Sequence, residues 1–179
     1  MNIMDLLNSK ENNSAIAQIA RQFGISEAEA RKAMGALSPS VARGLQQRTR
    51  EEIGMNDLID ALGVGKHERY IEEPELLGRE SATKDGNAIL GHIFGSKEVS
   101  RNVARDAGEK TSMGSSLMKR MLPVIASMVM ASLSKKVFGG SAKPQREESG
   151  GLLTSLLDSD GDGSIIDDVL GMAFKSFLR

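Results

Sequence analysis

The chain is 179 residues long, and 40% of them are hydrophobic, which is enough to form the core of one domain of ordinary size. It contains no cysteine, which excludes disulfide bonds and thiolate chemistry. Lys and Arg number 23 against 24 Asp and Glu, and this balance disfavours nucleic-acid binding, because such proteins usually carry a basic surplus. Residues 1–10 lack the basic start and the apolar stretch of a signal peptide, so we expect a cytoplasmic protein.

No segment alternates apolar and polar residues as a half-buried strand does, so the predicted fold class is all-α. Residues 1–63 are predicted to form a first helical repeat. The apolar face of its first clear helix consists of Ile16, Ile19, Ala20 and Phe23. Gly24 is expected to end this helix, because glycine tolerates a left-handed backbone, and Ser26 is expected to cap the next one.

The remaining helices of this repeat are predicted from prolines, caps and glycines. The helix that starts at Ser26 is expected to end at Ser38-Pro39, and a third helix is expected to run from there towards Glu52. A shorter helix over 57–62 is predicted between an Asn56 cap and a stop at Gly63. The buried stripe of the second helix is predicted to be Ala30, Ala33, Met34 and Leu37.

The chain matches itself without gaps at a shift of 84 positions. Residues 19–24 correspond to residues 103–108, and the match continues through Pro39, which meets Pro123, to Leu45, which meets Val129. We interpret this as one helical module used twice, in residues 1–63 and residues 86–138, with the copies packed around a pseudo-twofold axis. Residues 64–85 between them are rich in charge, contain Pro74, and are predicted to be a linker.

In the second copy, residues 123–133 are apolar all round, which predicts a central, buried helix. Lysines and arginines flank this run, and it is shorter than the roughly 20 residues of a membrane-spanning helix. We therefore expect a core helix and no membrane span.

Residues 139–151 are Gly, Ser and charged residues, a composition typical of a flexible linker. Residues 152–179 then form a predicted tail of helix, acidic loop and helix. Within the loop, residues 158–165 match the start of an EF-hand calcium loop, in which carboxylates at alternate positions converge on the ion. The candidate calcium ligands are Asp158, Asp160, Asp162, Ser164 and Asp168.

The acidic loop departs from the calcium pattern at its last ligand. The position that should carry a bidentate carboxylate is Val169, and Asp167 or Asp168 could replace it only if the loop is shortened. The alternative is a turn between two helices in which Asp162 or Ser164 caps the second one. Calcium is therefore a possible cofactor, and no other cofactor is indicated.

No set of residues assembles a nucleophile, a base and an orienting group, so we expect no enzymatic activity. His67 and His92 are the only histidines, and neither has a histidine partner at helical spacing, so both are expected to be surface or packing residues. Residues 16–37 have the spacing of a DNA-binding helix-turn-helix. However, Glu27 and Glu29 accompany Arg31 and Lys32 on the exposed face and would repel phosphates.

Several motifs together resemble a known family. They are Met1–Leu7, Gln22–Ser26, Gly86–Gly95, Met121–Pro123, and the tail motifs Leu157–Gly163 and Asp167–Met172. The combination resembles the bacterial domain of unknown function 937 family, which is distantly similar to the YidB-like proteins. The resemblance implies a helical fold with homeodomain-like helix-turn-helix elements and no established activity. It also implies an acidic tail of a kind often interpreted as calcium-binding.

The predicted function is that of a non-enzymatic cytoplasmic interaction or scaffold protein. Its duplicated module and its Met-rich apolar helix favour self-association, or binding of another protein partner. Two alternatives stay open. The chain could be a calcium-binding module that acts through the acidic loop, or a weak DNA-binding helix-turn-helix protein.

Overall fold

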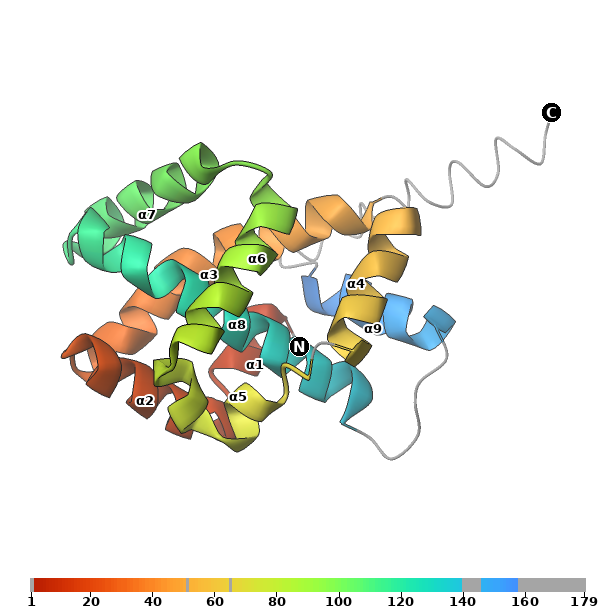
Figure 1. Ribbon diagram of the computed structural model, residues 1–179, viewed down its shortest axis with the longest axis horizontal. Helices are drawn as coiled ribbons and strands as arrows, with labels where there is room; N and C mark the ends of the chain where they lie inside the picture. The colour runs from red at the N-terminus through yellow and green to blue at the C-terminus, as the bar shows by residue number, and fades with distance from the viewer. Residues whose placement is uncertain (1, 51, 65, 140–145, 158–179) are drawn as a thin grey trace.

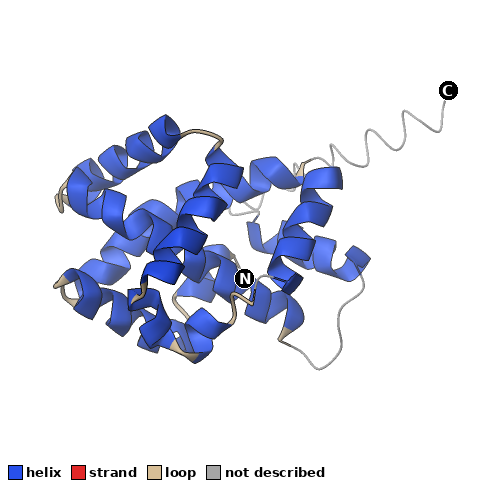
Figure 2. Cartoon of the chain, in the orientation of Figure 1, coloured by secondary structure: helices blue, strands red, loops and turns tan. Residues whose placement is uncertain are grey.

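The computed structural model describes residues 2–50, 52–64, 66–139 and 146–157. In this part of the chain every regular element is a helix, as Figure 2 shows, which confirms the all-α prediction. The elements in chain order are α1 (Ile3–Leu7), η1 (Lys10–Asn12), α2 (Asn13–Phe23), α3 (Glu27–Thr49), α4 (Glu52–Val64), α5 (Arg69–Glu72), η2 (Pro74–Gly78), α6 (Glu80–Phe94), α7 (Lys97–Thr111), α8 (Ser115–Phe138) and α9 (Arg146–Leu157).

Helix α8 lies at the centre of the fold, and α3, α6 and α7 pack around it (Figure 1). It also contacts α1, α2, α4, α5 and α9, so nearly the whole bundle shares this one helix. By length and composition α8 could cross a membrane, with a mean hydropathy of 1.4, but 83% of its most apolar window is buried inside the structure. This packing is that of a core helix, and its all-round apolar sequence accounts for it.

The turn between α2 and α3 forms as predicted. Gly24 has a φ of +66° and ends α2 in the left-handed conformation that glycine adopts without strain. The Ser26 side chain accepts from the Glu29 backbone N–H at 3.1 Å, and the Glu29 carboxylate accepts from the Ser26 backbone N–H at 2.8 Å. The bond from the Ser26 backbone N–H, and then one from the Ser26 hydroxyl at 3.0 Å, lower the pKa of the Glu29 carboxylate. The two bonds from backbone N–H groups form a capping box that fixes the start of α3.

The break predicted at Ser38-Pro39 is wrong, because α3 continues through Pro39 to Thr49. Likewise α8 begins at Ser115 and continues through Pro123. An internal proline costs a helix about 3 kcal/mol, because it lacks an N–H and crowds the preceding turn. Leu37 and Val41, on either side of Pro39, are both fully buried, and burying such side chains offsets this cost.

Residues 64–85 are not the linker expected from their charge. They contain α5, η2 and the start of α6, and Tyr70 and Leu77 are fully buried. Short apolar groups within this charged segment pack on α2 and α8, which explains why it folds with the core.

Helix α4 is also longer than predicted. It covers Glu52–Val64, so Asn56 and Gly63 lie inside the helix and are not its ends. Leu58, Ile59 and Leu62 are buried at helical spacing, and this buried face holds the longer helix.

The predicted flexible linker over 139–151 is helical in its last part, because α9 begins at Arg146. Leu153, Leu156 and Leu157 are buried, and α9 packs on α3, α4 and α8. The rest of the predicted tail, residues 158–179, lies outside the described residues.

The two segments that match at a shift of 84 positions both form a helix, a turn and a long helix with an internal proline. These pairs are α2 with α3 and α7 with α8. Their turns differ, because Gly24 ends α2, whereas Gly108 lies within α7 and a Cβ there would lie 2.7 Å from the Ser115 backbone nitrogen.

Candidate functional site

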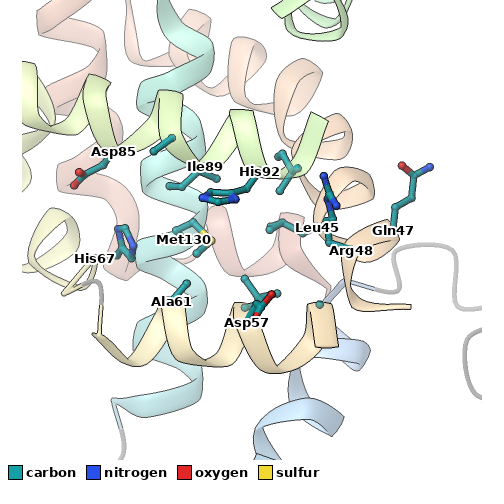
Figure 3. Close-up of a pocket in the computed structure, with 14 residues that line it drawn as sticks. Leu45, Gln47, Arg48, Asp57, Ala61, His67, Asp85, Ile89, His92 and Met130 are labelled. Atoms are coloured by element: carbon teal, nitrogen blue, oxygen red, sulfur yellow. The ribbon is translucent and has the colours of Figure 1, made fainter. Parts of the chain in front are cut away.

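A cavity of about 620 Å³ opens between α3, α4 and α6 (Figure 3). This volume is in the range of small-molecule and peptide sites. The residues that line it are Leu45, Gln47, Arg48, Gly54, Asp57, Leu58, Ala61, His67, Asp85, Ala88, Ile89, His92, Ile93 and Met130.

The floor of the cavity is apolar. Its large side chains are between 2% and 9% exposed, and they come from α3, α4, α6 and α8: Leu45, Leu58, Ile89, Ile93 and Met130. They are held in place by the bundle core to which they belong, so the floor is present before any ligand arrives.

One end of the cavity is built from a hydrogen-bonded cluster. The Tyr70 hydroxyl donates to Asp85 Oδ2 at 2.5 Å, and the Arg69 guanidinium donates to the same oxygen at 3.1 Å. The guanidinium also lies over the Tyr70 ring, 5.0 Å from its centroid. Asp85 and His67 both line the cavity at this end (Figure 3).

His67 is only 9% exposed, and its Nδ1 is buried without a hydrogen-bond partner in the described part of the chain. Burial lowers the pKa of His67 below 6.5 and the charge of Arg69 lowers it further, while the charge of Asp85 opposes the shift. The pKa of Tyr70 is raised, mainly by burial and then by its bond to Asp85, so this hydroxyl stays a donor. This end therefore presents a neutral imidazole and a carboxylate oxygen.

The other end of the cavity carries Arg48 and Gln47 from α3 (Figure 3). A Cβ at Gly95, the residue that ends α6, would lie 4.0 Å from Arg48 Nη2, which places the guanidinium at that end of α6. Asp57 from α4 and His92 from α6 lie between the two ends. Among the described residues none of these four side chains has a hydrogen bond or an ion pair.

This arrangement suits binding. An apolar floor with a few polar groups at its rim is the usual form of a ligand site. No group of three or more His, Cys, Asp or Glu in the described ranges is placed to hold a metal ion, so the two histidines and two aspartates here do not form a metal centre.

The predicted calcium ligands Asp158, Asp160, Asp162, Ser164 and Asp168 all lie outside the described residues, and calcium binding stays a prediction. Residues 16–37 form α2 and the first part of α3, and a DNA-binding helix-turn-helix stays a prediction. In this segment, the Arg31 guanidinium donates to Asn13 Oδ1 at 2.7 Å and so is held against α2.

His67 and His92 were expected to be isolated surface or packing residues. The structure brings both to one cavity, with His67 buried and His92 exposed. One sequence signal could have indicated half of this site. Asp85, Ala88, Ile89 and His92 share one face of a helix, with polar residues seven positions apart on either side of an apolar patch.

The chain belongs to a bacterial protein family of unknown function, DUF937, whose family model matches residues 5–136. This match covers most of the chain and confirms the family resemblance of the sequence. No curated protein and no solved structure matches the chain.

Proposed function

We propose that this member of the DUF937 family is a non-enzymatic helical interaction protein that binds its partner in the cavity between α3, α4 and α6. The observation that carries the proposal is the cavity itself, with an apolar floor formed by the core and polar side chains at its rim. Four of these, Arg48, Gln47, Asp57 and His92, make no hydrogen bond or ion pair within the described part of the chain.

The test is a thermal-shift screen of the full chain against a panel of small apolar and amphipathic compounds. A ligand that binds only the folded state raises the melting temperature, by an amount that grows with its concentration. Ala88→Phe places a large side chain at the cavity mouth, where Ala88 is exposed, and is expected to abolish the shifts.

The matched control is Ala28→Phe. This exposed alanine near the start of α3 does not line the cavity, so the substitution should leave the shifts unchanged. If no compound raises the melting temperature, or if every compound acts equally on Ala88→Phe, the cavity is not the binding site.

Self-association remains part of the proposal, and the burial of α8 limits where it can occur. The large apolar side chains exposed in the described residues are Val99 on α7 and Leu152 on α9. The faces around Val99 and Leu152 are therefore the first candidates for a dimer interface among the described residues. Light scattering of the purified protein, with calcium and then with a chelator, tests this. A defined oligomer in both conditions supports self-association, and a monomer at high micromolar concentration contradicts the proposed self-association.

Duplication of one helical module belongs to the same proposal. It is supported by the ungapped match at a shift of 84 positions and by the shared order of short helix, turn and long helix. DNA binding is not proposed. The start of α3 carries Glu27 and Glu29, and Arg31 is bonded to α2, so this helix is poorly suited to meet phosphates.

A further inference from the structure

The polar groups of the cavity differ between its two ends, and this difference indicates what the cavity accepts. At one end Arg48 offers a guanidinium without a partner among the described residues, which suits a carboxylate. At the other end lie the Asp85 carboxylate, which already accepts from Arg69 and Tyr70, and the His67 Nδ1, which has no partner among the described residues. Both are hydrogen-bond acceptors, which suit a donor such as an ammonium group.

The separation of the ends can be read from α6. Asp85 lies ten residues before Gly95, the residue beside which the Arg48 guanidinium lies. At about 1.5 Å per residue, these positions are about 15 Å apart along the helix axis. An extended peptide spans about 3.3 Å per residue, so about four residues bridge this length.

The middle of the cavity suits the body of such a peptide. Leu45, Ile89 and Met130 provide an apolar floor for side chains. Asp57 on α4 and His92 on α6 border the cavity from opposite sides. The backbone N–H and C=O groups of an extended peptide need hydrogen-bond partners, and these two side chains can provide them.

On these grounds we propose that the cavity binds a short apolar peptide of about four residues with free ends. Its carboxylate would lie at Arg48 and its ammonium group at Asp85 and His67. This inference rests on the proposed function, because it names the ligand class of the same cavity.

The probe is the tetrapeptide Leu-Ala-Ala-Leu, compared with its carboxamide and its N-acetyl form, each of which lacks one terminal charge. Binding to the full chain is measured by isothermal titration calorimetry. The free peptide should bind about tenfold more tightly than the carboxamide, because it alone makes a charge-assisted contact with Arg48. The N-acetyl form should also bind more weakly.

Arg48→Gln removes the guanidinium from an exposed position and should make the free peptide and the carboxamide bind equally. Arg43→Gln is the matched control, because Arg43 is an exposed arginine of α3 that does not line the cavity, and it should keep the tenfold difference. Ala88→Phe should abolish binding of all three peptides.

Four results would overturn the inference. Equal binding of the free peptide and the carboxamide to the wild-type chain would remove the role of Arg48. Undiminished binding of the N-acetyl form would remove the ammonium site. If no peptide binds while other compounds still stabilise the wild-type chain and not Ala88→Phe, the ligand class is wrong and the proposed function stands. If nothing acts at the cavity, both are wrong.

Discussion

Helices α3 and α8 match at the shift of 84 positions, with Pro39 aligned to Pro123, yet they occupy different places in the fold. Helix α8 is buried on almost every side, whereas α3 buries one face and exposes the other. This difference in burial coincides with three aligned pairs of residues. Two arginines of α3 and the arginine that directly follows it correspond to buried serines of α8, at the pairs Arg43 and Ser127, Arg48 and Ser132, and Arg50 and Ser134.

Each of these serines makes a hydrogen bond to a neighbouring element. Ser127 Oγ donates to the Ala82 carbonyl at 2.7 Å, and Ser134 Oγ donates to the Leu62 carbonyl at 2.9 Å. Ser132 Oγ lies 3.4 Å from Asn12 Oδ1. A small hydroxyl with a partner can be buried, but a guanidinium without a counter-ion cannot. Serines that find partners therefore suit the buried positions of α8, and the aligned arginines suit exposed positions.

The same comparison connects the fold with the proposed function. Because the polar face of α3 stays at the surface, Arg48 is available at the rim of the cavity. The aligned Ser132 is enclosed by the core and can contact only the protein itself. The peripheral long helix thus supplies Arg48 to the rim of the cavity, and the central one supplies Met130 to its floor.

Exchanging residues at the first aligned pair is expected to give the largest effect. Ser127→Arg would bury an unpaired charge in a packed core, and we expect a loss of more than about 4 kcal/mol in the free energy of unfolding. In the reverse change, Arg43→Ser, the substituted residue is exposed, so the free energy of unfolding should change by less than about 0.5 kcal/mol. Urea unfolding followed by circular dichroism measures both. Comparable losses for the two variants would contradict the assignment of α8 as the central helix.

The contact between α6 and α8 is expected to give the next largest effect. A Cβ at Gly86 would collide with the Pro123 carbonyl, so Gly86→Ala should separate the two helices and cost about 3 kcal/mol. At Gly91, on the same helix, a Cβ would meet nothing within 4 Å, so Gly91→Ala should stabilise the protein by about 0.5–1 kcal/mol. Melting temperatures that move in opposite directions are the expected result. A stabilised Gly86→Ala would show that the helices do not approach so closely.

The smallest expected effect is a pH dependence caused by His67. Because burial lowers its pKa below 6.5, the unfolded state binds more protons than the folded state under mildly acidic conditions. The free energy of unfolding should therefore fall as the pH decreases from 6.5 towards the lowered pKa, and it should be unaffected by this group at higher pH. Urea titrations across this pH window should show that the free energy of unfolding decreases with falling pH in the wild type, and decreases less in His67→Gln.

The control for the pH experiment is His92→Gln. This substitution removes an exposed histidine of the same cavity and leaves His67 buried. The free energy of unfolding of His92→Gln should therefore decrease with falling pH as much as that of the wild type. An equal pH dependence in His67→Gln and the wild type would mean that His67 is not buried as described.

Local signals in the sequence predicted local structure well. The left-handed Gly24, the Ser26 cap and the buried stripe from Ala30 to Leu37 depend on neighbours within a turn or two, and all three are confirmed. Pro39 and Pro123 misled the prediction, because the packing that keeps their helices continuous comes from distant parts of the chain.

The candidate site could not be predicted from the sequence for a similar reason. Its lining comes from four helices and from the segment around His67, which was interpreted as a linker because of its charge. Nothing near His67 in the sequence indicates that Asp85 and Arg48 border the same cavity. Only the α6 face that carries Asp85 and His92 could have been recognised from its spacing.

The most direct test of the account is the methyl resonance of Met130, the methionine that lines the cavity floor, during a titration with the tetrapeptide Leu-Ala-Ala-Leu. The account predicts a saturable chemical-shift change of the Met130 methyl in the wild type and in Ala28→Phe, and no change in Ala88→Phe. A Met130 signal that stays fixed while methyl groups elsewhere respond would contradict the central claim that this cavity is where the protein binds.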